Sequence, residues 1–212
     1  MERFQGIKES VSAEIQEKKS RFIADCMAVN GKEEAEEKIA EIKKKYADAR
    51  HHCFAYRVIE EEHILERCSD DGEPSGTAGA PMLNILSKNE LCNVLVVVTR
   101  YFGGILLGTG GLVRAYTDAT LKAILQAEKI EKEAGLEVVL EIPYSDNSKF
   151  QYFCKQEKIK IDKVEYLDNV KYQIEIPKKK KELFSIKKYN LNFEILKYEI
   201  KGQKYIDVNI EM

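Results

Sequence analysis

The chain lacks the sequence features that assign a protein to a membrane, to secretion or to the zinc-dependent proteins. Its N-terminus carries no apolar run of signal-peptide length, and its most hydrophobic segment, 94–98, is far too short to cross a bilayer. Its five cysteines include no C-x-x-C pair, so we expect reduced thiols and neither disulfides nor a zinc site. These absences predict a cytoplasmic protein with no membrane partner.

A strong excess of one charge is also missing. The 34 basic and 36 acidic side chains give a formal net charge of -2. This balance argues against a protein that coats nucleic-acid phosphates in the manner of a histone, although it leaves room for a local basic patch. No DNA-specific motif is present.

The length and composition suit two domains. The chain has 212 residues and 44% hydrophobic content, enough for real cores. Of its 12 glycines only Gly202 lies beyond residue 135, so we expect domains over 1–134 and 135–212. In the first, the pattern predicts strands over 20–29, 52–59 and 91–99 and helices over 32–47 and 112–127. We expect the strand over 91–99 to be central and covered on both faces, and the helix over 112–127 to be buried against the sheet. In the second, the pattern predicts a ferredoxin-like β-α-β-β-α-β order over 136–142, 145–156, 159–167, 170–176, 178–188 and 193–210.

The first glycine-rich stretch, 67–81, gathers acidic and hydroxyl side chains. Asp70, Asp71 and Glu73 are carboxylates of the kind that hold Mg²⁺, and Ser75 and Thr77 follow them. A short helix starting near residue 81 would add open amides that can receive an anion. The alternative is a surface turn whose side chains bond their own backbone.

The second glycine-rich stretch, 99–112, follows the expected central strand. Gly103, Gly104, Gly108, Gly110 and Gly111 let a backbone approach a ligand closely, and the helix after them offers amides and a positive dipole. Neither a P-loop nor a dinucleotide-binding fingerprint fits. A loop that only needs unusual backbone angles is the alternative. The aromatic pair at 101–102 offers either a stacking face or core packing.

Two arginines flank this second stretch. Arg100 and Arg114 sit beside strongly apolar neighbours in the sequence, so each guanidinium needs a partner. That partner is either a bound phosphate or a carboxylate of Asp70, Asp71 or Glu73. We expect the carboxylates to face the arginines.

Two adjacent histidines, His51 and His52, begin a predicted strand. Strand neighbours point to opposite faces, so only one can serve a given site, and a Cys53–histidine dyad is excluded for the same reason. A histidine near Asp70 and Ser75 would suit a general base, but a histidine that only hydrogen-bonds its surroundings is the favoured interpretation. The lysine run 178–181 suits a solvated surface or a phosphate backbone.

Three segments together resemble the signature of the YigZ/IMPACT family: RHHCFAYR (50–57), SDDGEPSGTAG (69–79) and RYFGGILLG (100–108). The opening KSRF (19–22) is similar too. The resemblance implies an α+β protein with an N-terminal ribosomal protein S5 domain 2-like α/β sandwich. It also implies a C-terminal ferredoxin-like domain similar to the last domain of elongation factor G. Eukaryotic members of this family are translation regulators that act through protein partners.

Three functions remain open from the sequence. The first is a translation-associated regulator that binds RNA, the ribosome or a translation-factor partner. The second is an enzyme that acts on a phosphorylated small molecule or nucleotide, with Mg²⁺ as a possible but not required cofactor. The third is a pure protein-interaction module. We rank binding first because no complete nucleophile–base set can be assembled. The candidate binding residues are His51, His52, Asp70, Asp71, Glu73, Ser75, Thr77, Arg100, Tyr101, Gly103, Gly104, Gly108, Gly110, Gly111 and Arg114.

Overall fold

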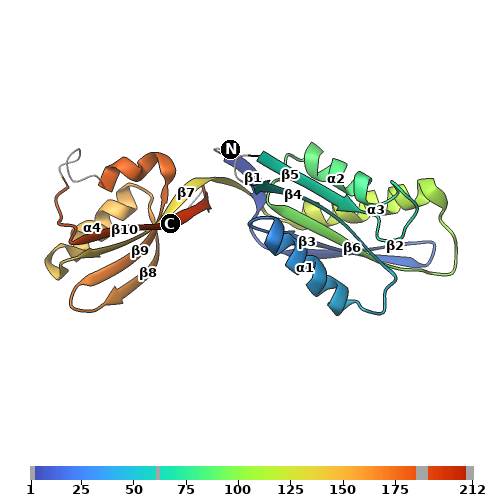
Figure 1. The fold of residues 1–212 in the computed structure, drawn as a ribbon, viewed down its shortest axis with the longest axis horizontal. Helices are drawn as coiled ribbons and strands as arrows, with labels where there is room; N and C mark the ends of the chain where they lie inside the picture. The colour runs from blue at the N-terminus through green and yellow to red at the C-terminus, as the bar shows by residue number, and fades with distance from the viewer. Residues whose placement is uncertain (1–2, 61–62, 185–190, 209–212) are drawn as a thin grey trace. The chain divides into compact units, whose positions relative to one another are not determined.

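The computed structural model describes residues 3–60, 63–184 and 191–208. The chain forms two compact units, one over Arg3–Ile130 and one from Glu131 onward. Each unit combines helices with antiparallel strand pairs, which confirms the expected α+β class (Figure 1). The strand β7 (Lys129–Ile142) runs through the division, and the domain boundary at 134–135 stays a prediction.

The N-terminal unit is a sheet covered by helices on both faces. Its strand order is β2 (Val11–Glu17), β3 (Ser20–Ala28), β6 (Val94–Tyr101), β4 (His51–Glu60) and β5 (His63–Ser69). The helix α1 (Lys32–Lys45) packs on one face, and α2 (Gly79–Lys88) and α3 (Gly108–Gln126) pack on the other. A short strand, β1 (Arg3–Ile7), lies beside the turn before β6, where the Cys92 N–H donates to the Gln5 carbonyl at 2.9 Å. The sequence pattern missed β1, β2 and β5.

The core of this unit follows from strand alternation. In β6, Val94, Val96 and Val98 face α2 and α3, whereas Leu95 and Val97 face α1. All five are fully buried, which confirms the expected central strand covered on both faces. The strand starts at Val94 and not at residue 91, because Asn93 turns the chain at φ 55° and its side-chain oxygen accepts the Ile59 N–H at 2.8 Å.

The helix α3 begins at Gly108, four residues before the expected start at Leu112. The glycine cluster therefore supplies the first helical turn and not only a loop, and Gly108 begins it with a positive φ of 72°. The helix is also less buried than expected, since Leu125 is 80% exposed. Within the described ranges, no helix combines the length and apolarity needed to cross a membrane.

The second sheet has the path β1-β7-β9-β8, and β10 also pairs with β7, so the strands of the second unit follow the order β10-β7-β9-β8. One face of these strands is covered. The remaining elements of the unit are a 3₁₀ turn (Tyr144–Asp146), α4 (Asn147–Gln156), β8 (Lys160–Tyr166), β9 (Val170–Pro177), a second 3₁₀ turn (Lys178–Phe184) and β10 (Lys197–Asp207). The second turn stands where an α-helix over 178–188 was expected, and residues 185–188 lie outside the described residues. The Asp146 side chain at the N-cap of α4 makes no capping hydrogen bond, because its carboxylate accepts the Glu194 N–H at 2.9 Å and the Lys149 ammonium at 2.7 Å.

Candidate binding site

The four family motifs meet at one end of the N-terminal sheet. The loops involved are the β2–β3 turn (17–20), the α1–β4 connection (46–50), the β5–α2 loop (70–78) and the β6–α3 loop (102–107). Antiparallel pairing places them together, because His51 pairs with Arg100 and Arg21 pairs with Tyr101. We call this end the motif end; it lies at the right in Figure 1.

Asp70 organises the β5–α2 loop from inside. Its Oδ2 accepts the Gly76 N–H at 2.8 Å, and its Oδ1 accepts the N–H groups of Ala78 and Gly79 at 2.9 Å each. Partial burial acts to raise the pKa of Asp70, but these three donors outweigh it and lower the pKa below its usual value. The Asp70 carboxylate therefore holds the start of α2 and does not face Arg100.

Acidification is expected to loosen this loop. Because the folded-state pKa of Asp70 lies below the ordinary value of 3.8, its contribution to stability is complete above that pH and is lost as the pH falls through the folded-state pKa. Asp70→Asn should be less stable than the wild type at neutral pH, and the difference should shrink below about pH 4. Urea unfolding at several pH values measures this. Asp118→Asn, at an exposed carboxylate, is the control, and a difference that persists undiminished near pH 2 would contradict the assignment.

Asp71 joins the loop to α1 and to β4. Its Oδ1 accepts from Lys43 Nζ at 2.8 Å, and its Oδ2 accepts the His52 backbone N–H at 2.8 Å. Burial acts to raise the pKa of Asp71, and these two partners lower it overall. His51 Nδ1 lies 3.0 Å from the Asp71 carbonyl oxygen.

Neither histidine is placed as a general base beside Asp70 and Ser75. The buried His52 ring points toward α1, with Nε2 at 2.9 Å from the Tyr46 carbonyl oxygen. His51 contacts the loop backbone from the other face of the strand, as the alternation predicts. Both rings are engaged in structural hydrogen bonds.

Glu73 and Arg100 form a buried ion pair. Arg100 Nη1 donates to Glu73 Oε1 at 2.7 Å, and the side chains are 7% and 3% exposed. The same oxygen accepts from the Tyr116 hydroxyl at 2.8 Å. The expected facing of carboxylates and arginines is thus correct for this pair and wrong for Asp70 and Asp71, which have other partners.

Cys53 extends this interior network. Its thiol lies 3.3 Å from the Tyr116 hydroxyl and 2.9 Å from the Asp70 carbonyl oxygen. Burial raises the pKa of Cys53 to about 12, so the sulfur is a neutral thiol and a poor nucleophile at neutral pH. The network ties α3, β4 and the β5–α2 loop together.

Arg114 does not share this environment. It lies on the solvent face of α3, and among the described residues its guanidinium makes no hydrogen bond or ion pair. The expectation that it needs a partner inside the fold was wrong, because the helical period directs Leu112, Ala115 and Tyr116 to the core and turns Arg114 away.

The two hydroxyl residues of the β5–α2 loop differ in exposure. Thr77 is buried and donates from Oγ1 to the Pro74 carbonyl at 2.6 Å, which closes a turn. Ser75 is exposed at the tip of the same loop. Of the two, only Ser75 is accessible to a ligand.

The β6–α3 loop is fastened to the β2–β3 turn. The Gly103 N–H donates to Ser20 Oγ at 3.1 Å, and a Cβ at this position would lie 2.0 Å from the Lys19 carbonyl carbon. The Tyr101 hydroxyl donates to Asp48 at 2.7 Å. Gly104 and Gly108 have positive φ, 84° and 72°.

The carboxylates of the motif end do not converge on a metal position. Across 3–60, 63–184 and 191–208, no group of three His, Cys, Asp or Glu side chains is arranged to hold an ion. Asp70, Asp71 and Glu73 each point to different protein partners. The geometry does not favour Mg²⁺ chemistry at this site.

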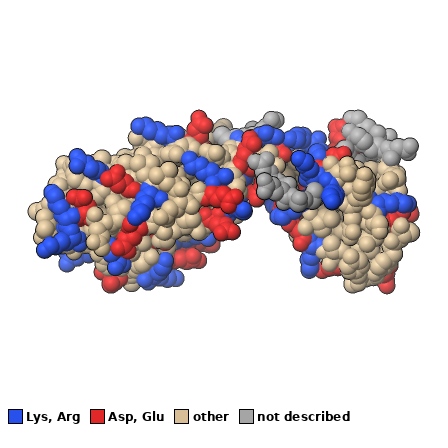
Figure 2. Space-filling view, turned by 180° about the vertical axis from the view of Figure 1, so that it is seen from behind, with Lys and Arg blue, Asp and Glu red and all other residues tan. Residues whose placement is uncertain are grey.

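The outer surface of the motif end carries cations and apolar side chains. Lys18, Lys19, Arg50 and Arg114 are exposed, and within the described part of the chain none forms an ion pair. Phe102 is 52%, Ile105 43% and Leu106 84% exposed. Basic side chains are visible at the left-hand end of the larger unit in Figure 2.

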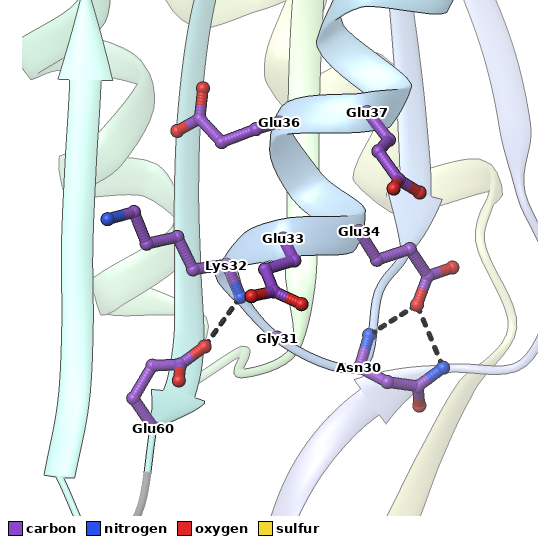
Figure 3. A pocket seen from close by; sticks show the side chains of 8 residues that line it. All are labelled: Asn30, Gly31, Lys32, Glu33, Glu34, Glu36, Glu37 and Glu60. Atoms are coloured by element: carbon purple, nitrogen blue, oxygen red, sulfur yellow. Dashed lines mark hydrogen bonds between the residues drawn. The ribbon is translucent and has the colours of Figure 1, made fainter.

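Another pocket lies away from the motif end, at the start of α1. It measures about 780 Å³ and is lined by five glutamates together with Asn30, Gly31 and Lys32 (Figure 3). Three of these carboxylates have protein partners: Glu60 accepts the Lys32 N–H at 2.6 Å, Glu34 accepts the Asn30 N–H at 2.8 Å, and Glu36 accepts from Arg67 Nη1 at 2.6 Å. Glu60 thereby satisfies the first N–H of α1.

The lysine run of the second unit is largely engaged. Lys179 pairs with Glu133 at 2.8 Å and Lys180 pairs with Glu157 at 2.8 Å. This favours the solvated-surface interpretation over phosphate binding.

Two residues that contact the site were not predicted from the sequence. Tyr116, the only aromatic residue of α3, joins the buried ion pair, and Lys43 on α1 neutralises Asp71. The helical period of the apolar residues in α3 would have placed Tyr116 in the core. Nothing in the sequence separates Lys43 from its lysine neighbours.

Comparison with known proteins agrees with the family that the motifs indicated. A family model described as the Impact N-terminal domain covers residues 18–124, and one described as a domain of unknown function (DUF1949) covers 140–187. IMPACT family member YvyE of Bacillus subtilis is 37% identical over 84% of this chain and 82% of its own length. IMPACT family member YigZ of Escherichia coli is 37% identical over 80% of this chain and 84% of its own. A crystal structure of a hypothetical protein has a TM-score of 0.65 at 34% identity, covering 92% of this chain and 97% of that one. The resemblance is thereby confirmed, and this chain belongs to the IMPACT family.

Proposed function

We propose that this protein is a cytoplasmic translation regulator that acts by binding, and that the motif end contacts the ribosome, its RNA or a translation-factor partner. The observation that carries the proposal is the separation of charges there. The carboxylates of Asp70, Asp71 and Glu73 turn inward to protein donors, while the side chains of Lys18 and Arg114 turn outward. The outward cations Lys18, Lys19, Arg50 and Arg114 outnumber the exposed carboxylates of Glu17 and Asp118 beside them, and this local excess of positive charge suits an acidic macromolecule.

The family supports the same function. The relative named protein IMPACT of Mus musculus is 37% identical to this chain over 98 residues, which is 44% of this chain and 30% of its own length. Eukaryotic IMPACT proteins regulate translation through protein partners, as the motif resemblance implies. We extend this role to the present chain through the domain that they share.

Catalysis is the weaker alternative. The thiol of Cys53 is buried and neutral, and the rings of His51 and His52 are held by backbone carbonyls. A nucleophile, a base and an orienting group are not assembled at the motif end. A binding role needs only the exposed side chains that the motif end already presents.

The fold families implied by the motifs are part of the proposal. The helix-covered sheet of the N-terminal unit supports a ribosomal protein S5 domain 2-like fold. The order β10-β7-β9-β8 supports a ferredoxin-like fold, similar to the last domain of elongation factor G.

Co-sedimentation of the full chain with purified ribosomes over a salt series tests the function. We expect binding that weakens as salt rises, because ion pairs with phosphate or carboxylate are screened. Arg114→Glu should reduce affinity by about tenfold, since it reverses an exposed charge at the contact. Arg100→Ala is unsuitable here because Arg100 is buried in an ion pair.

Lys155→Glu on α4 is the matched control, since it makes the same charge change at another exposed position. It should stay within about twofold of the wild type. Absence of binding at every salt concentration, or equal loss in both variants, would overturn the proposed function.

A further inference from the structure

A second pocket lies at the motif end itself. It measures about 340 Å³ and is formed by β2, the β2–β3 turn and the start of α3. Ile15, Leu107 and Ala115 supply its apolar walls, and Gly110 and Gly111 supply bare backbone. This volume is at the small end of ligand pockets, roughly 300–1,000 Å³, and is ample for one large side chain.

Gly110 has no explanation within the fold. It lies in α3, its φ is not positive, and an added Cβ would meet nothing within 4 Å. Glycine destabilises a helix relative to alanine because it loses more backbone freedom on folding. Gly111 differs, because its Cβ would lie 3.1 Å from the Leu107 Cβ. The bare backbone at Gly110 is thus open to a molecule outside the fold.

The rim of the pocket carries charges of both signs. Lys18 and Arg114 are cations, and Glu17 and Asp118 are carboxylates. Among the described residues none of the four forms an ion pair. Such a rim is complementary to a segment with charged groups of both signs. It is less suited to a phosphate chain, which the two carboxylates repel.

The part of the β6–α3 loop that directly precedes the pocket residue Leu107 is aliphatic, whereas the exposed ring of Phe102 lies at the other end of the loop, beside Arg100. Ile105 and Leu106, directly before Leu107, are 43% and 84% exposed. Aliphatic side chains bury well against other apolar side chains but offer no flat face for a nucleobase. The apolar loop therefore extends the pocket toward a protein partner.

We propose that this pocket receives an apolar side chain from a partner protein, whose backbone passes directly over Gly110. Neighbouring charged side chains of that segment pair with Arg114 and Asp118. This inference rests on the proposed function, because it names the class of partner that the motif end binds.

A peptide selection tests the inference. A random peptide display library is selected on the full chain, and the affinity of an enriched peptide is measured for the wild type, Gly110→Leu and Gly202→Ala. Gly110→Leu places a side chain in the pocket, where there is room for it. It should raise or preserve Tm while it weakens peptide binding by about tenfold or more. Gly202→Ala, also without neighbours within 4 Å, is the control and should bind within about twofold of the wild type.

Each outcome decides the inference. Enriched peptides that share an apolar residue flanked by charges, and that are lost in Gly110→Leu, support it. Failure to enrich any peptide, or equal binding by Gly110→Leu, overturns it. So does binding of a mixed-sequence RNA oligonucleotide that Gly110→Leu abolishes. If ribosomes sediment equally with the wild type and Gly110→Leu, the inference fails and the function stands. If the peptide binds but ribosomes do not, the function fails and the pocket stands.

Discussion

Arg100→Ala is expected to lower the free energy of unfolding of the N-terminal unit by about 3–5 kcal/mol, because it leaves a buried carboxylate without its cation. Arg100 and Glu73 are nearly inaccessible, and among the residues that the structure describes Glu73 has Arg100 and the Tyr116 hydroxyl as its side-chain partners. Urea unfolding followed by far-UV circular dichroism measures the loss, since the chain contains no tryptophan.

Two controls separate the pair from a general effect of removing arginine. Arg114→Ala should change the free energy of unfolding by no more than about 0.5 kcal/mol, because its side chain is exposed. Adding Glu73→Gln to Arg100→Ala should recover part of the loss, because the unpaired charge is then removed. A double variant as unstable as the sum of the two single variants would show that the charges are not coupled.

Gly103→Ala is expected to cost about 3 kcal/mol or more in unfolding free energy, because the new Cβ meets backbone that cannot yield. It would lie 2.0 Å from the Lys19 carbonyl carbon and 2.3 Å from the Ser20 nitrogen. The β2–β3 turn and the β6–α3 loop would have to separate. Denaturant unfolding measures the loss of stability, and a lower yield of folded protein is a second indication of it.

Gly110→Ala is the matched control in the same glycine cluster. Its Cβ enters open space on a helix, so stability should be unchanged or slightly raised. Equal destabilisation by the two substitutions would show that glycine is required throughout the cluster for local flexibility. A difference confirms that Gly103 is required for close packing.

The motifs combine carboxylates, arginines and glycines, as active sites do, but the Arg100–Glu73 pair and Gly103 have structural roles. Glu73, Arg100 and Gly103 hold three loops in one arrangement, and the surface that these loops present is formed by other residues, such as Lys18 and Arg114. These motif residues therefore hold the binding surface in place and do not form it. A loss of binding in Arg100→Ala would therefore report an altered loop arrangement and not a missing contact.

The sequence by itself determined the family, the central strand and the position of the glycine-rich loops. A short run such as 94–98 is rich in valine and has no polar face, which favours a strand covered on both sides. The adjacent histidines were also placed correctly on opposite faces, because strand alternation leaves no choice. These conclusions depend on local geometry alone.

Only the tertiary structure decided which charges meet. Asp70, Asp71 and Glu73 are close neighbours in the chain, yet the turn at Asp71, with φ 41°, directs their carboxylates to three different sets of donors. Arg100 is buried because it continues the inward face of β6, whereas Arg114 is exposed because α3 turns it to solvent. Pairing between groups far apart in sequence depends on how strands and helices are placed in space, and no local pattern encodes that.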